Sequence, residues 1–168
     1  SQLNGADTIP PLGHLPVTVP GTVDGWFELH NRYGKLAMSQ VLAPAIRYAR
    51  EGFPISPVIG FYFERAQRSF ESRVDQINEF ENARATYFSP EAPKVGDIFK
   101  NDDLGKTLAI LAKGGRDAFY KGKIAKTIDR YMRRIGGDLT YSDLATHTSE
   151  WVDPCLLYTS DAADEFSC

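Results

Sequence analysis

The sequence predicts a mainly α-helical chain with one or two short strands, and three observations support this. Apolar residues recur at intervals of three and four over most of the length. Glycines and helix-capping residues separate these stretches. Apolar and polar residues alternate only briefly, at residues 17–19. With 168 residues, 42% of them hydrophobic and 24% charged, the chain has the composition of one ordinary globular domain.

The charge pattern argues against two classes of partner. The net charge is -3, from 19 basic and 22 acidic residues, and gives no basic footprint for nucleic acid or an anionic membrane. No apolar run approaches the roughly 20 residues of a membrane span. The first sixteen residues lack the basic and apolar regions of a signal peptide, and the cellular location stays unknown. Cys155 and Cys168 form neither a disulfide framework nor a zinc-ligand spacing.

The first elements are predicted around one sharp corner. Residues 1–16 are rich in Gly and Pro and are expected to be loop. The run VTVPGTVDGW then indicates a strand at 17–19 and a turn at Pro20-Gly21, because proline cannot donate to a ladder and glycine permits unusual backbone angles. Thr22 is placed to cap a helix that ends at Gly34.

Two helical patterns follow. The first spans Leu42 to the stop at Gly52, with Pro44 either at the first helical position or kinking the first turn. The second predicts one long helix from Ile59 to Phe80, because apolar residues step down one face at intervals of three and four. That stripe is expected to be a core face rather than a ligand site, and it comprises Ile59, Phe63, Ala66, Phe70, Val74, Ile77 and Phe80.

The remaining elements carry clear start and stop signals. Residues 88–100 are expected to be loop with a short apolar run near Ile98, and Asn101 should cap the next helix. That helix should bury its leucines and end at Gly114-Gly115, with one more turn after it; the leucines are Leu104, Leu108 and Leu111. A further helix should span 124–135, and Thr140 with Asp143 forms a capping-box-like start of a short helix through about His147.

No side chain or group of side chains predicts a catalytic, cofactor-binding or metal site. The histidines, His14, His30 and His147, do not pair with another ligand at metal spacing, and His30 is expected to have a packing role. Asp24, Asp102 and Asp103 each lie in the first turn of a predicted helix, where the helix dipole is a sufficient explanation. Ser1 could in principle act as an N-terminal nucleophile, but a Gly-rich polar loop follows it rather than a buried strand.

An ordered series of motifs resembles one enzyme family. The segments VPGTVDGW, LAPAIRYAREGFP, GDIFKNDDL, GGRDAFYKGKIA and GGDLTYSDL occur in the order found in the large subunit of γ-glutamyltranspeptidases. The resemblance covers about residues 15 to 154. It divides the chain into a loop at 1–16, a helical part of the large subunit at 17–154, and a tail at 155–168. The tail, CLLYTSDAADEFSC, changes composition and is expected to be foreign to the fold.

The resemblance implies a fold and a chemistry for the complete enzyme. The family belongs to the N-terminal nucleophile hydrolases, with a four-layer αββα sandwich. The precursor cleaves itself, and the new N-terminal Thr of the small subunit attacks the γ-glutamyl carbonyl of glutathione or a related amide. The γ-glutamyl group then passes to water or to an amino acid, without a metal or organic cofactor.

The catalytic parts of that family are not found in this sequence. It contains no Thr-Thr-His motif, and no Arg-Glu-x-x-Pro context for a substrate-binding arginine precedes Val17. We therefore expect an inactive piece whose partners are the remainder of the large subunit and the small subunit, with a γ-glutamyl substrate bound only by the complete enzyme. The alternative is a stand-alone helical binding or scaffolding module.

Overall fold

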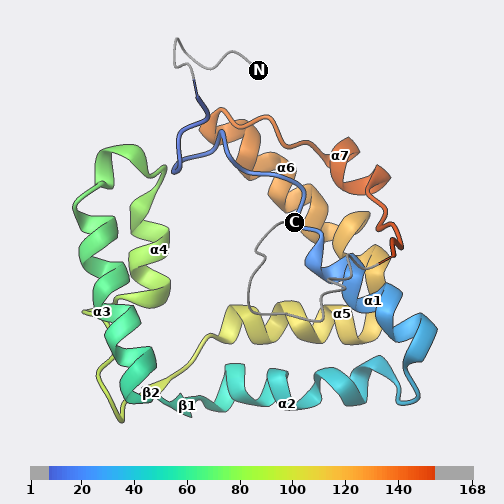
Figure 1. Ribbon diagram of the computed structural model, residues 1–168, viewed down its shortest axis with the longest axis horizontal. Helices are drawn as coiled ribbons and strands as arrows, with labels where there is room; N and C mark the ends of the chain where they lie inside the picture. Colours follow the sequence, from blue (N-terminus) through green and yellow to red (C-terminus); the bar gives the residue numbers. More distant parts are fainter. Residues whose placement is uncertain (1–7, 154–168) are drawn as a thin grey trace, which may run out of the picture.

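The computed structural model describes residues 8–153 and is mainly helical, which confirms the predicted class. Figure 1 shows a helical body and a two-helix arm joined by a small sheet. The elements are α1 (Thr22–Tyr33), α2 (Met38–Glu51), β1 (Phe53–Pro54), α3 (Pro57–Glu71), the 3-10 helix η1 (Val74–Gln76), α4 (Phe80–Tyr87), β2 (Ile98–Phe99), α5 (Asp102–Tyr120), α6 (Lys123–Ile135) and α7 (Tyr141–Thr146). None of these helices is long and apolar enough to cross a membrane.

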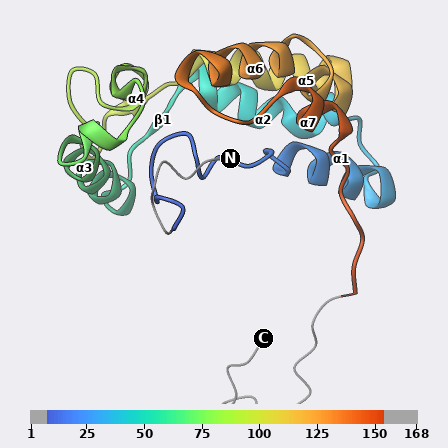
Figure 2. The same ribbon diagram turned by 90° about the horizontal axis from the view of Figure 1, so that it is seen from above.

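The body is built on α2 and α5, which run antiparallel and side by side (Figures 1 and 2). Gly105 permits their close approach, because a Cβ there would lie 2.8 Å from Cγ of Arg50. The helices α1, α6 and α7 then pack around α5. Burial of apolar side chains stabilises this arrangement. The core cluster contains Val23, Phe27, Leu42, Leu108, Leu111, Tyr120, Ala125, Met132, Leu139 and Leu144.

The arm consists of α3 and α4 and stands to one side of the body (Figures 1 and 2). Its base is the antiparallel pair β1–β2, in which Phe53 faces Phe99 and Pro54 faces Ile98. Residues 88–100 are loop as predicted, except that the apolar run Ile98–Phe99 forms β2. The rings of Phe70 and Phe88 pack 6.0 Å apart and join α3 to the segment that follows α4.

The corner before α1 differs from the prediction in two respects. Residues 17–19 are not a strand, since the described residues offer them no pairing partner, and the side chain of Val17 is 43% exposed. Thr22 is not the cap either, because the helix is capped at Gly21 without a side-chain hydrogen bond. The hydroxyl of Tyr120 accepts the hydrogen bond from the Asp24 amide instead, so a distant residue satisfies this helix end.

Both expectations for Pro44 are wrong. α2 begins at Met38, so Pro44 lies in its second turn rather than at the first helical position or in the first turn. The start of α2 is stabilised earlier, by the Gln40 side chain accepting from the Ala37 amide at 3.1 Å. The predicted stop at Gly52 is confirmed, and its φ of 92° suits a glycine.

The single long helix predicted for 59–80 is also wrong. α3 ends at Glu71, and the Ser72 hydroxyl donates to the carbonyl of Ser69 at 2.9 Å, which competes with continued helix. Glu79 has a φ of 51° just before α4, so the chain reverses there. The reversal brings α4 back along the apolar stripe but covers it only partly, and Ile59 remains 40% exposed.

The start and stop signals of the second half are mostly confirmed. Asn101 accepts from the Leu104 amide at 2.9 Å, and Thr140 forms a capping box with Asp143. Gly115 breaks α5 with a φ of 68°, a value that favours glycine. The predicted burial of Leu104 is wrong: its side chain is 48% exposed, whereas Leu108 and Leu111 are buried.

Candidate functional site

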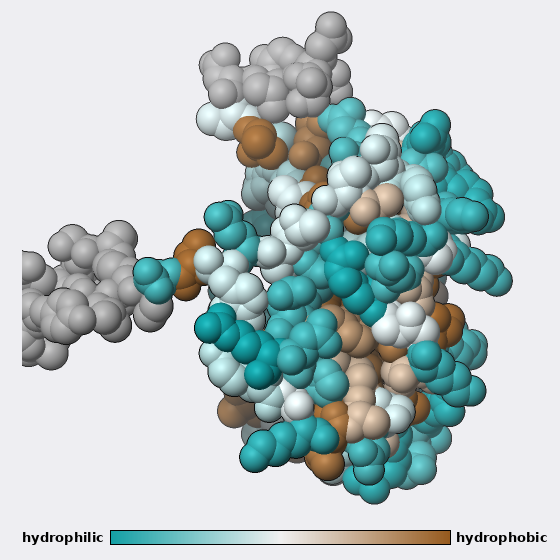
Figure 3. Space-filling view, turned by 90° about the vertical axis from the view of Figure 1, so that its right-hand side faces the viewer, coloured by the Kyte–Doolittle hydropathy of each residue, from teal (hydrophilic) through white to brown (hydrophobic). Residues whose placement is uncertain are grey.

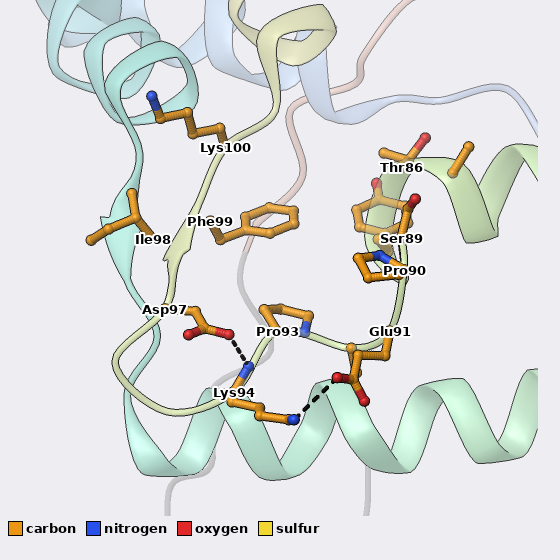
Figure 4. Close-up of a pocket in the computed structure, with 13 residues that line it drawn as sticks. Thr86, Ser89, Pro90, Glu91, Pro93, Lys94, Asp97, Ile98, Phe99 and Lys100 are labelled. Carbon is orange, nitrogen blue, oxygen red and sulfur yellow. Dashed lines mark hydrogen bonds and ion pairs between the residues drawn. The ribbon is translucent and has the colours of Figure 1, made fainter.

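The first candidate site is an open pocket of about 750 Å³ at the base of the arm. The end of α4, the loop after it and β2 line this pocket, as Figure 4 shows. The Phe99 ring extends from β2 toward the wall that carries Ser89 and Pro90. Lys94 pairs with Glu91 at 3.0 Å, and its amide donates to Asp97 at 2.8 Å. The lining thus offers hydroxyl and charged groups to a small polar molecule, but it brings together no nucleophile and base.

The second candidate site is a buried polar cluster under the first turn of α1. Asp24 is only 1% exposed and pairs with Arg116, which follows the break in α5 at Gly115. Arg116 also donates to the backbone carbonyl of His147, just after α7. One guanidinium therefore joins three parts of the chain, because its planar fork presents several donors at once.

Tyr120 forms the floor of the cluster. Its hydroxyl accepts from the Asp24 amide at 3.0 Å and donates to the carbonyl of Pro20. Its ring stacks on the imidazole of His147 with centroids 5.3 Å apart, and the Arg116 guanidinium lies 4.6 Å from its centroid. A completely buried tyrosine with its hydroxyl doubly bonded fixes the Pro20-Gly21 corner in place.

Electrostatics favour the charged forms of the ion pair. Burial raises the pKa of the Asp24 carboxyl, but the hydrogen bond and charge of Arg116, together with the side chain and backbone of Ser149, outweigh it, so the pKa lies below its usual value of 3.8. The hydrogen bond to Asp24 raises the pKa of Arg116. Burial raises the pKa of the Tyr120 phenol, which therefore stays protonated as a donor. The cluster is thus a fixed ion pair with a neutral tyrosine.

One contact in the cluster is incomplete. The second carboxylate oxygen of Asp24 lies 3.7 Å from Nε2 of His147, and neither buried atom has a hydrogen-bond partner among residues 8–153. That separation is too long for a hydrogen bond. Arg116 and Tyr120 together bond the Asp24 carboxylate, the Asp24 amide and the backbone carbonyls of His147 and Pro20, so the arrangement is suited to fixing three segments of the chain.

The remaining sequence candidates lie apart from this cluster. His14 contacts Asn78 at 3.1 Å, and His30 contacts the carbonyl of Leu36 at 2.7 Å. Asp102 and Asp103 lie in the first turn of α5 as predicted. Ser1 lies outside the described residues. Within residues 8–153, no three His, Cys, Asp or Glu side chains are grouped to hold a metal ion.

Sequence reasoning missed the role of Asp24 and His147. The helix dipole explained Asp24 locally, but its main partner is Arg116, 92 residues away. The only available signal was an aspartate on the buried face of an apolar helix, since charged residues are rarely buried without a partner. The prediction that the chain carries no catalytic, cofactor-binding or metal residue stays a prediction.

Comparisons with known proteins agree with the motif series. The model of a family described as gamma-glutamyltranspeptidase matches residues 2–162. The chain is 38% identical over 145 residues to the glutathione hydrolase proenzyme of Pseudomonas aeruginosa, covering 85% of this chain and 24% of that relative. The match range includes the predicted loop at 2–16 and part of the predicted tail at 155–168. The division of the chain at those boundaries stays a prediction, and the tail lies outside the described residues.

Solved structures share the arrangement of these helices. A cephalosporin acylase from Bacillus halodurans aligns with a TM-score of 0.84 and 36% identity, over 90% of this chain and 28% of that one. The gamma-glutamyltranspeptidase of Helicobacter pylori aligns with a TM-score of 0.77 and 31% identity, over 86% of this chain and 40% of that one. The chain therefore spans between about a quarter and two fifths of the length of these relatives.

Proposed function

Because the chain belongs to the γ-glutamyltranspeptidase family, we propose that it is a section of an enzyme that transfers or hydrolyses γ-glutamyl groups of glutathione and related amides. In that enzyme the section supplies helices of the large subunit, and an N-terminal Thr elsewhere supplies the chemistry. The section alone is inactive. Its partners are the remainder of the large subunit and the small subunit.

The observation that carries this proposal is the 38% identity to a glutathione hydrolase proenzyme over 85% of the chain. A gamma-glutamyltranspeptidase structure also shares the helical arrangement, at 31% identity over 86% of the chain. Similarity of that extent covers packing as well as motifs. The inactivity is supported separately, by the lack of a Thr-Thr-His motif in the sequence. The buried cluster of Asp24, Arg116 and Tyr120 fits a supporting role, since it fixes the corner from which α1 begins.

The test is a chimeric enzyme. The matching section of the Pseudomonas aeruginosa glutathione hydrolase proenzyme is replaced by residues 17–153 of this chain, and release from a chromogenic γ-glutamyl anilide is measured. We expect the chimera to process itself and turn over, whereas the isolated chain gives no release above blank. Turnover by the isolated chain would contradict its inactivity. A folded chimera without processing or turnover would contradict the proposed enzyme.

A second candidate function is a binding module without catalysis, and the open face of the arm favours it. A groove of about 320 Å³ along α3 is lined wholly by apolar and aromatic side chains, including Ile59, Phe63 and Phe70. Such a groove can accept an amphipathic helix. The binding-module hypothesis predicts that the isolated chain is stable and monomeric. Light scattering after gel filtration measures its molar mass. Aggregation of the isolated chain would count against it.

A further inference from the structure

The segment after α7 crosses α1 and makes few backbone–backbone hydrogen bonds among the described residues. We call residues 147–153 the strap; Figures 1 and 2 show it leaving α7 and passing α1. Among the described residues, its one backbone–backbone hydrogen bond is His147 to Leu144, at the end of α7. Val152 is 74% exposed. Segments with few buried contacts and few backbone hydrogen bonds open at low cost.

The first anchor of the strap is at His147. Its carbonyl accepts from Arg116, and its ring stacks on Tyr120. The same ring lies over the second carboxylate oxygen of Asp24, at 3.7 Å from Nε2. The docked strap thus helps to keep Asp24 out of water, although the contact between these two side chains is not itself a hydrogen bond.

The second anchor is at Trp151, near the other end of α1. The indole N–H donates to Glu28 at 3.2 Å, and the Arg32 guanidinium lies 4.3 Å from the ring. The Tyr33 ring meets the indole edge-on with centroids 6.1 Å apart. Trp151 nevertheless remains 48% exposed, so these are surface contacts of modest strength.

Both anchors can engage at the same time. The eight residues from Asp24 to Arg32 rise about 12 Å along a helix. The four residues from His147 to Trp151 reach about 13 Å when extended. The strap therefore has the reach to contact the first and last turns of α1 without stretching.

We propose that the strap is a conformational latch that docks on α1 through His147 and Trp151 and opens as a unit while the helical body stays folded. Opening admits water to the Asp24–Arg116 pair. The inference depends only on the contacts within this chain and holds whether or not the proposed function is correct.

The experiment separates strap opening from helix unfolding. The chain has two tryptophans, so Trp26→Phe leaves Trp151 as the single indole fluorophore. Its emission and acrylamide quenching are followed in a urea titration, in parallel with far-ultraviolet circular dichroism. We expect the Trp151 signal to change at a lower urea concentration than the helix signal. Coincident midpoints in the two signals would overturn the proposal.

A matched pair of variants tests the second anchor. Arg32→Gln removes the cation over the indole and should raise the ratio of open to docked strap roughly two- to fivefold. The helix midpoint should not move. Arg68→Gln is the control, because Arg68 makes an exposed pair with Glu64 on the arm. Equal effects of the two variants on Trp151 quenching would contradict the latch.

A second measurement avoids the Trp26 substitution. Fluorotryptophan labelling of the unmodified chain gives separate fluorine resonances for Trp26 and Trp151. The Trp151 resonance should shift toward its unfolded position at a urea concentration where the Trp26 resonance is still native. Simultaneous loss of both native resonances would also overturn the proposal.

Discussion

Replacing Arg116 by methionine tests the main feature of the buried cluster. The Asp24 side chain is 2% exposed and that of Arg116 is 22% exposed, so the pair is largely removed from solvent. Arg116→Met keeps much of the side-chain volume but leaves the Asp24 carboxylate buried without its cation. Removing one partner of a buried ion pair costs about 3–5 kcal/mol. We therefore expect a loss of that size in the free energy of unfolding.

The assay is urea unfolding followed by circular dichroism at neutral pH. For a chain of this length the loss corresponds to a fall in melting temperature of roughly 6–20 °C. The double variant Asp24→Asn with Arg116→Met should lose less than the sum of the two single variants, because the second change removes the stranded charge. Arg68→Met is the control: its pair with Glu64 is 63% exposed on both sides and should contribute little.

Two results would refute this reasoning. If the free energy of unfolding of Arg116→Met lies within about 1 kcal/mol of that of the parent chain, Asp24 is hydrated or otherwise paired in solution. Strict additivity of the two single variants would show that the side chains are not coupled.

Three other positions give independent tests. The pKa of Asp24 is lowered in the folded chain, so its contribution to folding stability is present above about pH 5 and is lost as the pH falls through the folded pKa. Asp24→Asn should therefore reduce the fall in melting temperature at low pH, measured by thermal melts across pH. An unchanged fall at low pH would contradict this. Leu111 is 1% exposed, so Leu111→Ala should lower the free energy of unfolding in urea by about 2–5 kcal/mol. Leu104 is 48% exposed, so Leu104→Ala should lower it clearly less. Equal losses would contradict the burial of Leu111 in the core. Thr140→Ala should cost about 1 kcal/mol by removing the bonds with Asp143, and no loss in thermal melts would count against that capping box.

Local signals in the sequence were enough to place most helix ends. Asn101 caps α5, and Thr140 with Asp143 starts α7, because each side chain bonds an amide three residues away. Gly115 breaks α5 because its backbone adopts a conformation that few other residues tolerate. These interactions close within one turn, so the neighbouring residues determine them.

Helical periodicity gave a wrong prediction where the chain forms two helices, α3 and α4, in place of one. The stripe from Ile59 to Phe80 has a helical period throughout, yet the helix ends at Glu71 and the chain reverses at Glu79. The period specifies which side chains share a face, but it does not distinguish one long helix from a shorter helix with a second one packed against it. Packing of Phe88 onto Phe70 accompanies the second arrangement.

The sequence by itself determined the helical class, the caps at Asn101 and Thr140 and, through the order of its motifs, the family. Only the tertiary structure decided the partners of Asp24, Tyr120 and Trp151. Arg116 bonds the Asp24 carboxylate across 92 residues of sequence, and the Tyr120 hydroxyl bonds the Asp24 amide across 96. Trp151 bonds Glu28 across 123 residues. No periodicity encodes such separations, since a buried charge is stabilised by whichever partner the packed helices bring within reach.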